Sequence, residues 1–175
     1  MPNARKMLSD WDAPYIQDLV KAIETQSKLT LAHWAVDYAG KILLPVWKKD
    51  DPEDIRPEAA LDSARKWLSG QIKLPEAKAK IILCHEAARE AQKSPAAQAA
   101  ARAIGQSAST IHSARHCIGL ALYGALAVAY DALGTKASWA ELEACAAEEC
   151  ARMLDALRAV SVENETNPAR IDWKC

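Results

Sequence analysis

The stretch CHEAAREAQKSPAAQAAARAIGQSASTIHSARHCIGLALY, residues 84–123, decides the fold of this chain. It is rich in alanine, the residue that loses the least conformational freedom when a helix forms. Ser94 followed by Pro95 predicts a helix start, because serine caps free N–H groups and proline fits the first turn. Short hydroxyl side chains between Ser107 and Thr110 compete for backbone hydrogen bonds, so this helix should weaken there.

The whole chain has the composition of a helical globular protein. Its 175 residues include 36 alanines and six tryptophans but no phenylalanine, with 50% hydrophobic and 26% charged residues. We expect an all-α fold, a compact bundle of about seven helices that forms one domain over residues 1–175. An apolar central helix is predicted at about 114–133, and the tail 162–175 is expected to be held loosely.

Proline, glycine and charged residues mark the expected helix ends. Pro45 should end or kink a helix over residues 28–44, and the mixed-charge segment 48–57 should be a solvated loop. Gly70 and Gly134 follow apolar helical patterns, where glycine stops a helix by adopting a left-handed conformation.

The net charge, the longest uncharged run and the cysteines limit which partners and which cellular location we expect. The net charge of −1 provides no basic field for nucleic acid, so no nucleic-acid partner is expected. The longest uncharged run, residues 117–130, is too short to cross the roughly 30 Å hydrocarbon layer of a membrane. The five cysteines contain no CxxC pair and no secretory leader is apparent, so we expect a cytoplasmic protein with reduced cysteines.

Three histidines are the first candidates for chemistry. His112 and His116 are four residues apart, which on one helix places both rings on the same face, as two zinc ligands require. His85 is a possible third ligand from a neighbouring helix, but no fourth ligand is evident. We therefore expect the histidines to have structural roles, with no metal or other cofactor; metal binding and acid–base catalysis are the alternatives.

A second candidate lies before the helix that Pro57 opens. Asp54 is placed to cap that helix, and Arg56 to reach a carboxylate such as Glu86 or Glu90. The structural interpretation is a salt bridge that fixes the loop. The functional alternative is a site for an anionic group, to which Arg89 would contribute from the face of His85.

Carboxylates gather near the C-terminus. Ser138 and Glu141 have the spacing of a capping box, which starts a helix. Glu143, Glu148 and Glu149 follow with Glu141 along an acidic edge, which is either a solvated helix face or a surface for a basic partner. The loop over residues 48–54 is the other candidate surface for a partner.

The chain resembles the Imm-5-like family of immunity proteins from polymorphic toxin systems. The resemblance rests on four stretches in the expected order: AHWAVDYAGKILLPVW (32–47), DIRPEAALDSARKWLSGQI (54–72), CHEAARE (84–90) and AAARAIGQSASTIHSARHCIGLALYGALA (99–127). The family implies an all-α protein that binds and neutralises a cognate protein toxin by occlusion, without enzymatic activity.

By position, the resemblance implies a polar cluster of Asp54, Arg56, Trp67, His85, Arg89, His112 and His116. The chain departs from the family pattern at Gln106, where another histidine is expected. The runner-up function is a metal-dependent enzyme or small-molecule binder built on the histidines and Arg89. Self-association into a homo-oligomer is compatible with both functions, because small residues line the helix faces.

Overall fold

In the computed structural model, which describes residues 4–174, all regular secondary structure is helical. The α-helices are α1 (Pro14–Ile23), α2 (Lys28–Tyr38), α3 (Leu44–Asp50), α4 (Arg56–Leu68), α5 (Leu74–Glu90), α6 (Pro95–Ser109), α7 (Leu126–Leu133) and α8 (Trp139–Val160). Two π-helical segments, η1 (Ala39–Leu43) and η3 (Leu120–Ala125), and a 3₁₀ segment, η2 (Ala114–Ile118), complete them. The segment η1 joins α2 to α3, and η2 and η3 lead into α7. The described residues therefore form seven continuous helices, which confirms the all-α prediction.

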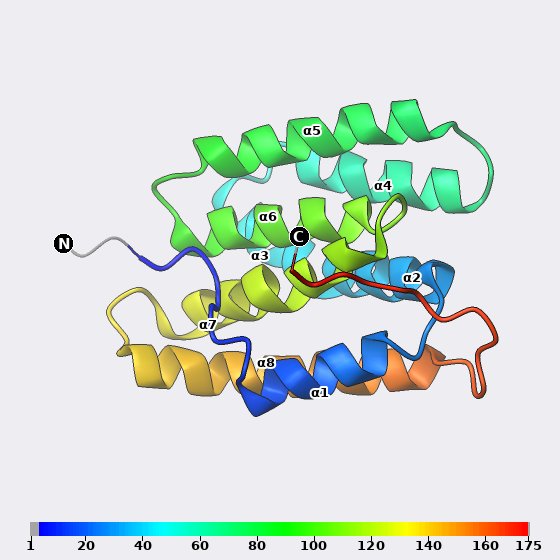
Figure 1. The fold of residues 1–175 in the computed structure, drawn as a ribbon. Helices are drawn as coiled ribbons and strands as arrows, with labels where there is room; N and C mark the ends of the chain where they lie inside the picture. The colour runs from blue at the N-terminus through cyan, green and yellow to red at the C-terminus, as the bar shows by residue number, and fades with distance from the viewer. Residues whose placement is uncertain (1–3, 175) are drawn as a thin grey trace.

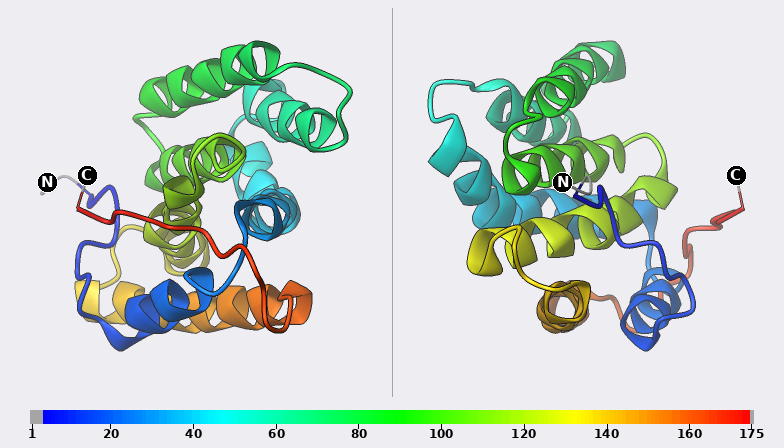
Figure 2. Two further views of the ribbon diagram at one scale, coloured as in Figure 1. Left: turned by 45° about the vertical axis from the view of Figure 1, so that its right-hand side comes forward. Right: turned by 90° about the vertical axis from the view of Figure 1, so that its left-hand side faces the viewer.

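The helices are arranged around a central group. Figures 1 and 2 show α4 and α5 on one side of α6, α7 and the α2–α3 helix, with α1 and α8 on the opposite side. Buried alanines on α6 let the neighbouring helices approach closely, because a methyl side chain holds them apart very little. Between them, large side chains such as Trp47 and Leu126 fill the core.

The central apolar helix predicted at 114–133 is present. Contrary to the expectation from the uncharged run, the helix over Ala114–Leu133 is long and apolar enough to cross a membrane, but 67% of its apolar window is buried inside the protein. An apolar composition is what we expect of a helix that packs in the core, among the other helices.

Of the two outcomes expected at Pro45, an end or a kink of the helix near residue 44, the end is wrong. The helix continues from α2 through η1 into α3 and stops only at Asp50. Proline lacks an N–H group and its ring crowds the carbonyl one turn earlier, and the wider π turn just before Pro45 accommodates both. The expected loop therefore shortens to Asp51–Ile55.

Several predicted helix ends are confirmed. Gly70 and Gly134 have φ angles of +75° and +76°, the left-handed conformation that glycine adopts without a Cβ clash. Ser138 accepts a hydrogen bond from the backbone N–H of Glu141, whose carboxylate in turn accepts from the N–H of Ser138. Ser94 likewise accepts from the N–H of Ala97 at the start of α6.

The tail beyond α8 makes specific contacts, where the sequence favoured a loosely held segment. The side chain of Gln26 accepts a hydrogen bond from the N–H of Val162 and donates one to its carbonyl. Near the end, the indole N–H of Trp173 donates to Glu24 at 2.8 Å, and its ring lies 5.9 Å from that of Trp11. Cys175 lies outside the described residues.

The other four cysteines are free thiols. Cys84, Cys117 and Cys150 are buried, and Cys145 is half-buried. Burial raises the pKa of the Cys84 thiol to about 12, so it stays protonated, and it donates to the carbonyl of Ala101. These thiols are therefore packing groups with little thiolate character.

Candidate functional site

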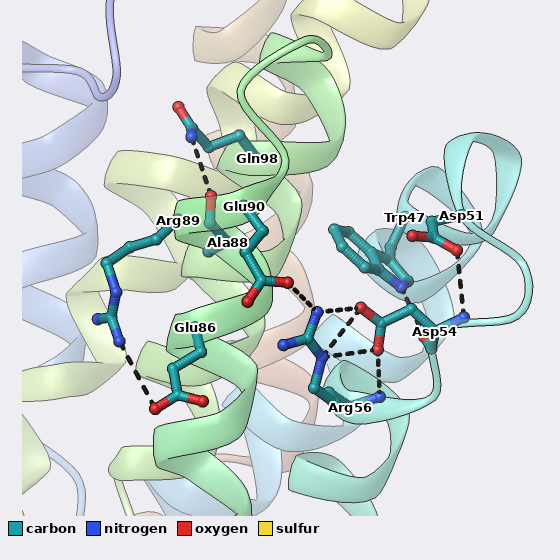
Figure 3. A network of polar contacts seen from close by, with 9 residues as sticks. All are labelled: Trp47, Asp51, Asp54, Arg56, Glu86, Ala88, Arg89, Glu90 and Gln98. Carbon is teal, nitrogen blue, oxygen red and sulfur yellow. Dashed lines mark hydrogen bonds and ion pairs between the residues drawn. The ribbon is translucent and has the colours of Figure 1, made fainter.

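Arg56 stands at the centre of a network of ion pairs between two helices (Figure 3). At the start of α4, its guanidinium contacts the Asp54 carboxylate through Nη2 at 2.6 Å and Nε at 3.0 Å. Nη2 also lies 2.6 Å from Oε2 of Glu90, at the end of α5. The predicted bridge to a neighbouring carboxylate is therefore present, and Glu90 is its acceptor. The Arg56 guanidinium lowers the pKa of Asp54, so this carboxyl remains ionised.

Three further hydrogen bonds fix the loop that carries Asp54 (Figure 3). The carboxylate of Asp54 accepts from the backbone N–H of Arg56 at 3.0 Å and so satisfies the first N–H of α4, although the cap residue itself is Ile55. Its carbonyl accepts from the indole N–H of the buried Trp47 at 2.9 Å, and its N–H donates to Asp51. The backbone between α3 and α4 is thus held in one conformation before any partner arrives.

A pocket of about 620 Å³ lies beside this network, between the α3–α4 loop and the turn that joins α5 to α6. We call it the acidic pocket, because it is lined by four carboxylates (Asp50, Asp51, Asp54 and Glu90) against two cations (Arg56 and Lys93). Ser94, also in its wall, donates a hydrogen bond to Asp50. Within the same loop, the side chain of Ile55 is 64% exposed.

The histidines do not share one α-helix, contrary to the expectation from their spacing. Helix α6 ends at Ser109, so His112 lies in the following turn and His116 in the 3₁₀ segment η2. The two rings are nevertheless neighbours, with centroids 5.1 Å apart and a tilt of 59°. Nδ1 of His112 is buried without a hydrogen-bond partner.

Gln106 on α6 is enclosed by contacts in the histidine region. Its Oε1 lies 2.8 Å from Nδ1 of His116, and its side chain packs against Gly119, where a Cβ would clash at 2.4 Å. One residue earlier, Gly105 leaves room for the ring of His85 from α5. The residue that departs from the family pattern therefore lies between two of the histidines and holds one of them.

The environment keeps these histidines neutral. Burial lowers the pKa values of His85, His112 and His116, and neighbouring cations or histidines lower them further, for His116 to about 4. Within residues 4–174, no group of three or more His, Cys, Asp or Glu side chains is arranged to hold a metal ion.

The rest of the predicted cluster is dispersed. Arg89 is 65% exposed and 3.9 Å from Glu86, a loose contact on the surface of α5. Trp67 is half-buried against the core at the other end of α4 from Arg56, roughly 16 Å away along the helix axis. The seven residues thus divide into the Arg56 network, the histidine region with Arg89 beside His85, and Trp67, which is separate.

Of the four carboxylates of the predicted acidic edge, Glu141 and Glu148 are exposed, whereas Glu143 and Glu149 contact side chains of other helices. Glu149 is only 3% exposed and accepts hydrogen bonds from Tyr38 and, at 2.7 Å, from Nε of Arg152. Glu143 accepts from the hydroxyl of Tyr15 at 2.9 Å, and Glu141 belongs to the capping box. Glu149 therefore does not lie on a solvated face, because α2 and α8 enclose it.

The sequence matches, over residues 21–156, the family described as Imm-5 like putative immunity protein. The chain belongs to this family. The match extends from the last turn of α1 into α8 and includes the acidic pocket and the histidine region, so the resemblance inferred from the four stretches is confirmed. Comparisons with curated proteins and with solved structures gave no match.

Proposed function

We propose that this protein binds a cognate protein toxin and neutralises it by occlusion, without a covalent step. Membership of a family of immunity proteins supports the general role. The proposal places the protein in the cytoplasm, where its free thiols remain reduced. Neither a nucleic acid nor a membrane is needed as a partner for this activity.

The acidic pocket carries the proposal about where the toxin binds. Four carboxylates with two cations leave an excess of negative charge, which suits a lysine- or arginine-bearing segment of the toxin. The exposed Ile55 in the same loop supplies an apolar contact of the kind that anchors interfaces. The sequence favoured two surfaces for a partner, this loop and the acidic edge of α8. One carboxylate of that edge, Glu149, is buried and is therefore not available to a partner.

The internal contacts of the loop reduce the conformational entropy that is lost on binding. Trp47, Arg56 and Glu90 already hold Asp54 in place, so little conformational freedom remains to be lost on association. Specific complexes bury about 1,600 Å² in total, which is more than one pocket provides. The interface should therefore extend over the outer surfaces of α3 and of the α5–α6 turn.

The experiment begins with capture of the partner from lysate of the native host. The captured protein is then expressed alone in a test bacterium, where it should arrest growth, and together with this protein, which should restore growth. A partner that is harmless when expressed alone, or whose toxicity is not relieved, contradicts the neutralising role.

The site is tested in the same growth assay with charge and apolar substitutions. Asp51→Lys and Ile55→Asp should abolish rescue, because the first reverses a charge that faces the basic segment and the second places a charge where an apolar contact is expected. The matched controls are Asp155→Lys, at a residue 79% exposed on α8, and Val160→Asp, at one 51% exposed, and both should rescue fully. Full rescue by both loop variants would exclude the acidic pocket as the interface.

A further inference from the structure

A second hollow, of about 600 Å³, has the opposite charge. It lies between the N-terminal segment, the end of α5 and α6, and it is lined by Arg5, Lys6, Arg89 and Arg102. No carboxylate is among its described lining residues. Four cations from three segments therefore surround one hollow in a chain whose net charge is −1.

The hollow continues into a smaller one of about 330 Å³, since Arg89 and Arg102 line both. The smaller hollow adds His85, Ile82 and Tyr123, which are a polar ring, an exposed apolar side chain and an aromatic ring. We call the two together the basic groove. One end of it is cationic, and the other offers an aromatic and an aliphatic surface.

The cations of the basic groove lack close internal counterions. Arg102 is half-buried, and within the described residues neither Arg102 nor Lys6 forms a hydrogen bond or an ion pair. Arg89 has only its loose contact with Glu86 at 3.9 Å, and the guanidinium of Arg5 lies over the ring of Trp139 at 4.0 Å. By contrast, Arg56 and Arg152 each have a carboxylate within 2.7 Å.

We propose that the basic groove binds a small molecule that carries two or more phosphate groups. Guanidinium groups match phosphate oxygens with paired hydrogen bonds, so Arg89 and Arg102 would hold the charge where the two hollows meet. A bound polyanion also relieves the repulsion between these cations. Tyr123 and Ile82 provide a surface for an attached planar group, such as a nucleobase.

This site is separate from the proposed toxin interface. The acidic pocket would repel a polyphosphate, and the basic groove would repel the basic segment expected of the toxin. Ligand binding at the groove is measured on the purified protein without a partner, so its outcome does not depend on whether a toxin exists.

His85 supplies a direct readout of occupancy. Burial lowers the pKa of its ring, and Arg89 and Arg102 lower it further. A bound phosphate group would counter these two cations and raise the pKa of His85. The midpoint of the His85 ring titration, followed by NMR, should therefore shift to higher pH when a ligand occupies the groove.

The experiment is calorimetric titration of the purified protein with inorganic tripolyphosphate and with adenosine triphosphate, at about 150 mM salt to suppress weak surface binding. Saturable one-to-one binding is expected. Arg89→Gln and Arg102→Gln should each weaken it about tenfold, since each removes a charge-assisted contact. Arg89 is exposed, so its variant keeps the test valid if Arg102→Gln fails to fold.

The matched control is Arg158→Gln, which removes the same charge at an exposed position on α8 and should leave binding unchanged. Tighter binding of the nucleotide than of tripolyphosphate, lost in Tyr123→Ala, identifies a nucleotide; equal binding identifies the phosphate chain alone. The proposal is overturned if neither probe saturates, or if Arg158→Gln weakens binding as much as the groove variants do.

Discussion

Replacing Tyr38 by phenylalanine tests whether Glu149 is an internal carboxylate or a surface one. The Tyr38 hydroxyl, at the end of α2, donates to Oε1 of Glu149 in the middle of α8. Burial and the hydrogen bond to the Glu149 carboxylate raise the pKa of Tyr38, so the hydroxyl stays protonated and keeps donating. Tyr38→Phe removes this one group and leaves the ring in place.

The expected cost follows from the burial of the acceptor. A hydrogen bond to a charged group contributes about 1.5–3 kcal/mol, and water cannot replace it at a carboxylate that is 3% exposed. Glu149 retains Arg152 as its second partner, so we expect a loss of about 2 kcal/mol. For a chain of 175 residues this corresponds to a fall in Tm of roughly 4–8 °C.

The assay is urea denaturation at pH 7 followed by far-UV circular dichroism, with a double-mutant cycle between Tyr38→Phe and Glu149→Gln. The coupling energy should be about 1–2 kcal/mol. Tyr15→Phe is the matched control: it deletes the same hydroxyl, but its acceptor Glu143 is only half-buried, so its cost should be below about 1 kcal/mol. If both substitutions cost the same, and less than about 0.5 kcal/mol, Glu149 is not desolvated and the reasoning fails.

Three further predictions concern the histidine region and the Arg56 network. Gly105→Ala brings a Cβ within 2.5 Å of the His85 ring and should lower the free energy of unfolding by about 1–2 kcal/mol. When His85 is also replaced by alanine, the clash is absent, and Gly105→Ala should raise the free energy of unfolding by about 0.5–1 kcal/mol. Urea denaturation of the two single variants and the double variant measures both effects. The pKa of His116 is lowered to about 4 in the folded protein, from about 6.5 when unfolded, so protonation favours unfolding. Stability should therefore fall as the pH drops from about 6.5 to about 4, and His116→Gln should flatten this part of the pH profile of urea midpoints. Asp54→Asn weakens the contact with Arg56 and should lower the free energy of unfolding by about 1 kcal/mol at pH 7 but by less at pH values below the ordinary range of a carboxyl, once the lowered pKa of Asp54 is passed; an unchanged pH 7 thermal melt would contradict it.

Helix type and most helix ends could be predicted because their causes are local. The glycines at 70 and 134 and the capping box at Ser138 act through their immediate neighbours, so the sequence alone contains the signal. Of the end or kink expected at Pro45, the end was wrong, because a π turn in the preceding residues accommodates the proline. The pairing of His112 with His116 was half right: the rings meet, but across a turn and a 3₁₀ segment.

The candidate site was harder to predict because it depends on contacts between distant segments. The sequence offered Glu86 and Glu90 equally to Arg56, and only the packing of α5 beside α4 selects Glu90. Burial of Glu149 depends on Tyr38, which lies 111 residues away in the chain. The sequence suggested an anion site with Arg89 beside His85, but the meeting of Arg89 with Arg5, Lys6 and Arg102 was missed, since a net charge near zero conceals it.

The two π-helical segments also fix the rotational phase of the helices that follow them. They pack against each other in the middle of the bundle, where Gly124 in η3 leaves space for the side chain of Leu43 in η1. If the residues of η1 wound as an ordinary α-helix, the extra residue of the wide turn would no longer be absorbed, and α3 would rotate by about 100° relative to α2. Trp47 would then turn away from the carbonyl of Asp54, so the loop beside the acidic pocket depends on a single extra residue a turn and a half earlier.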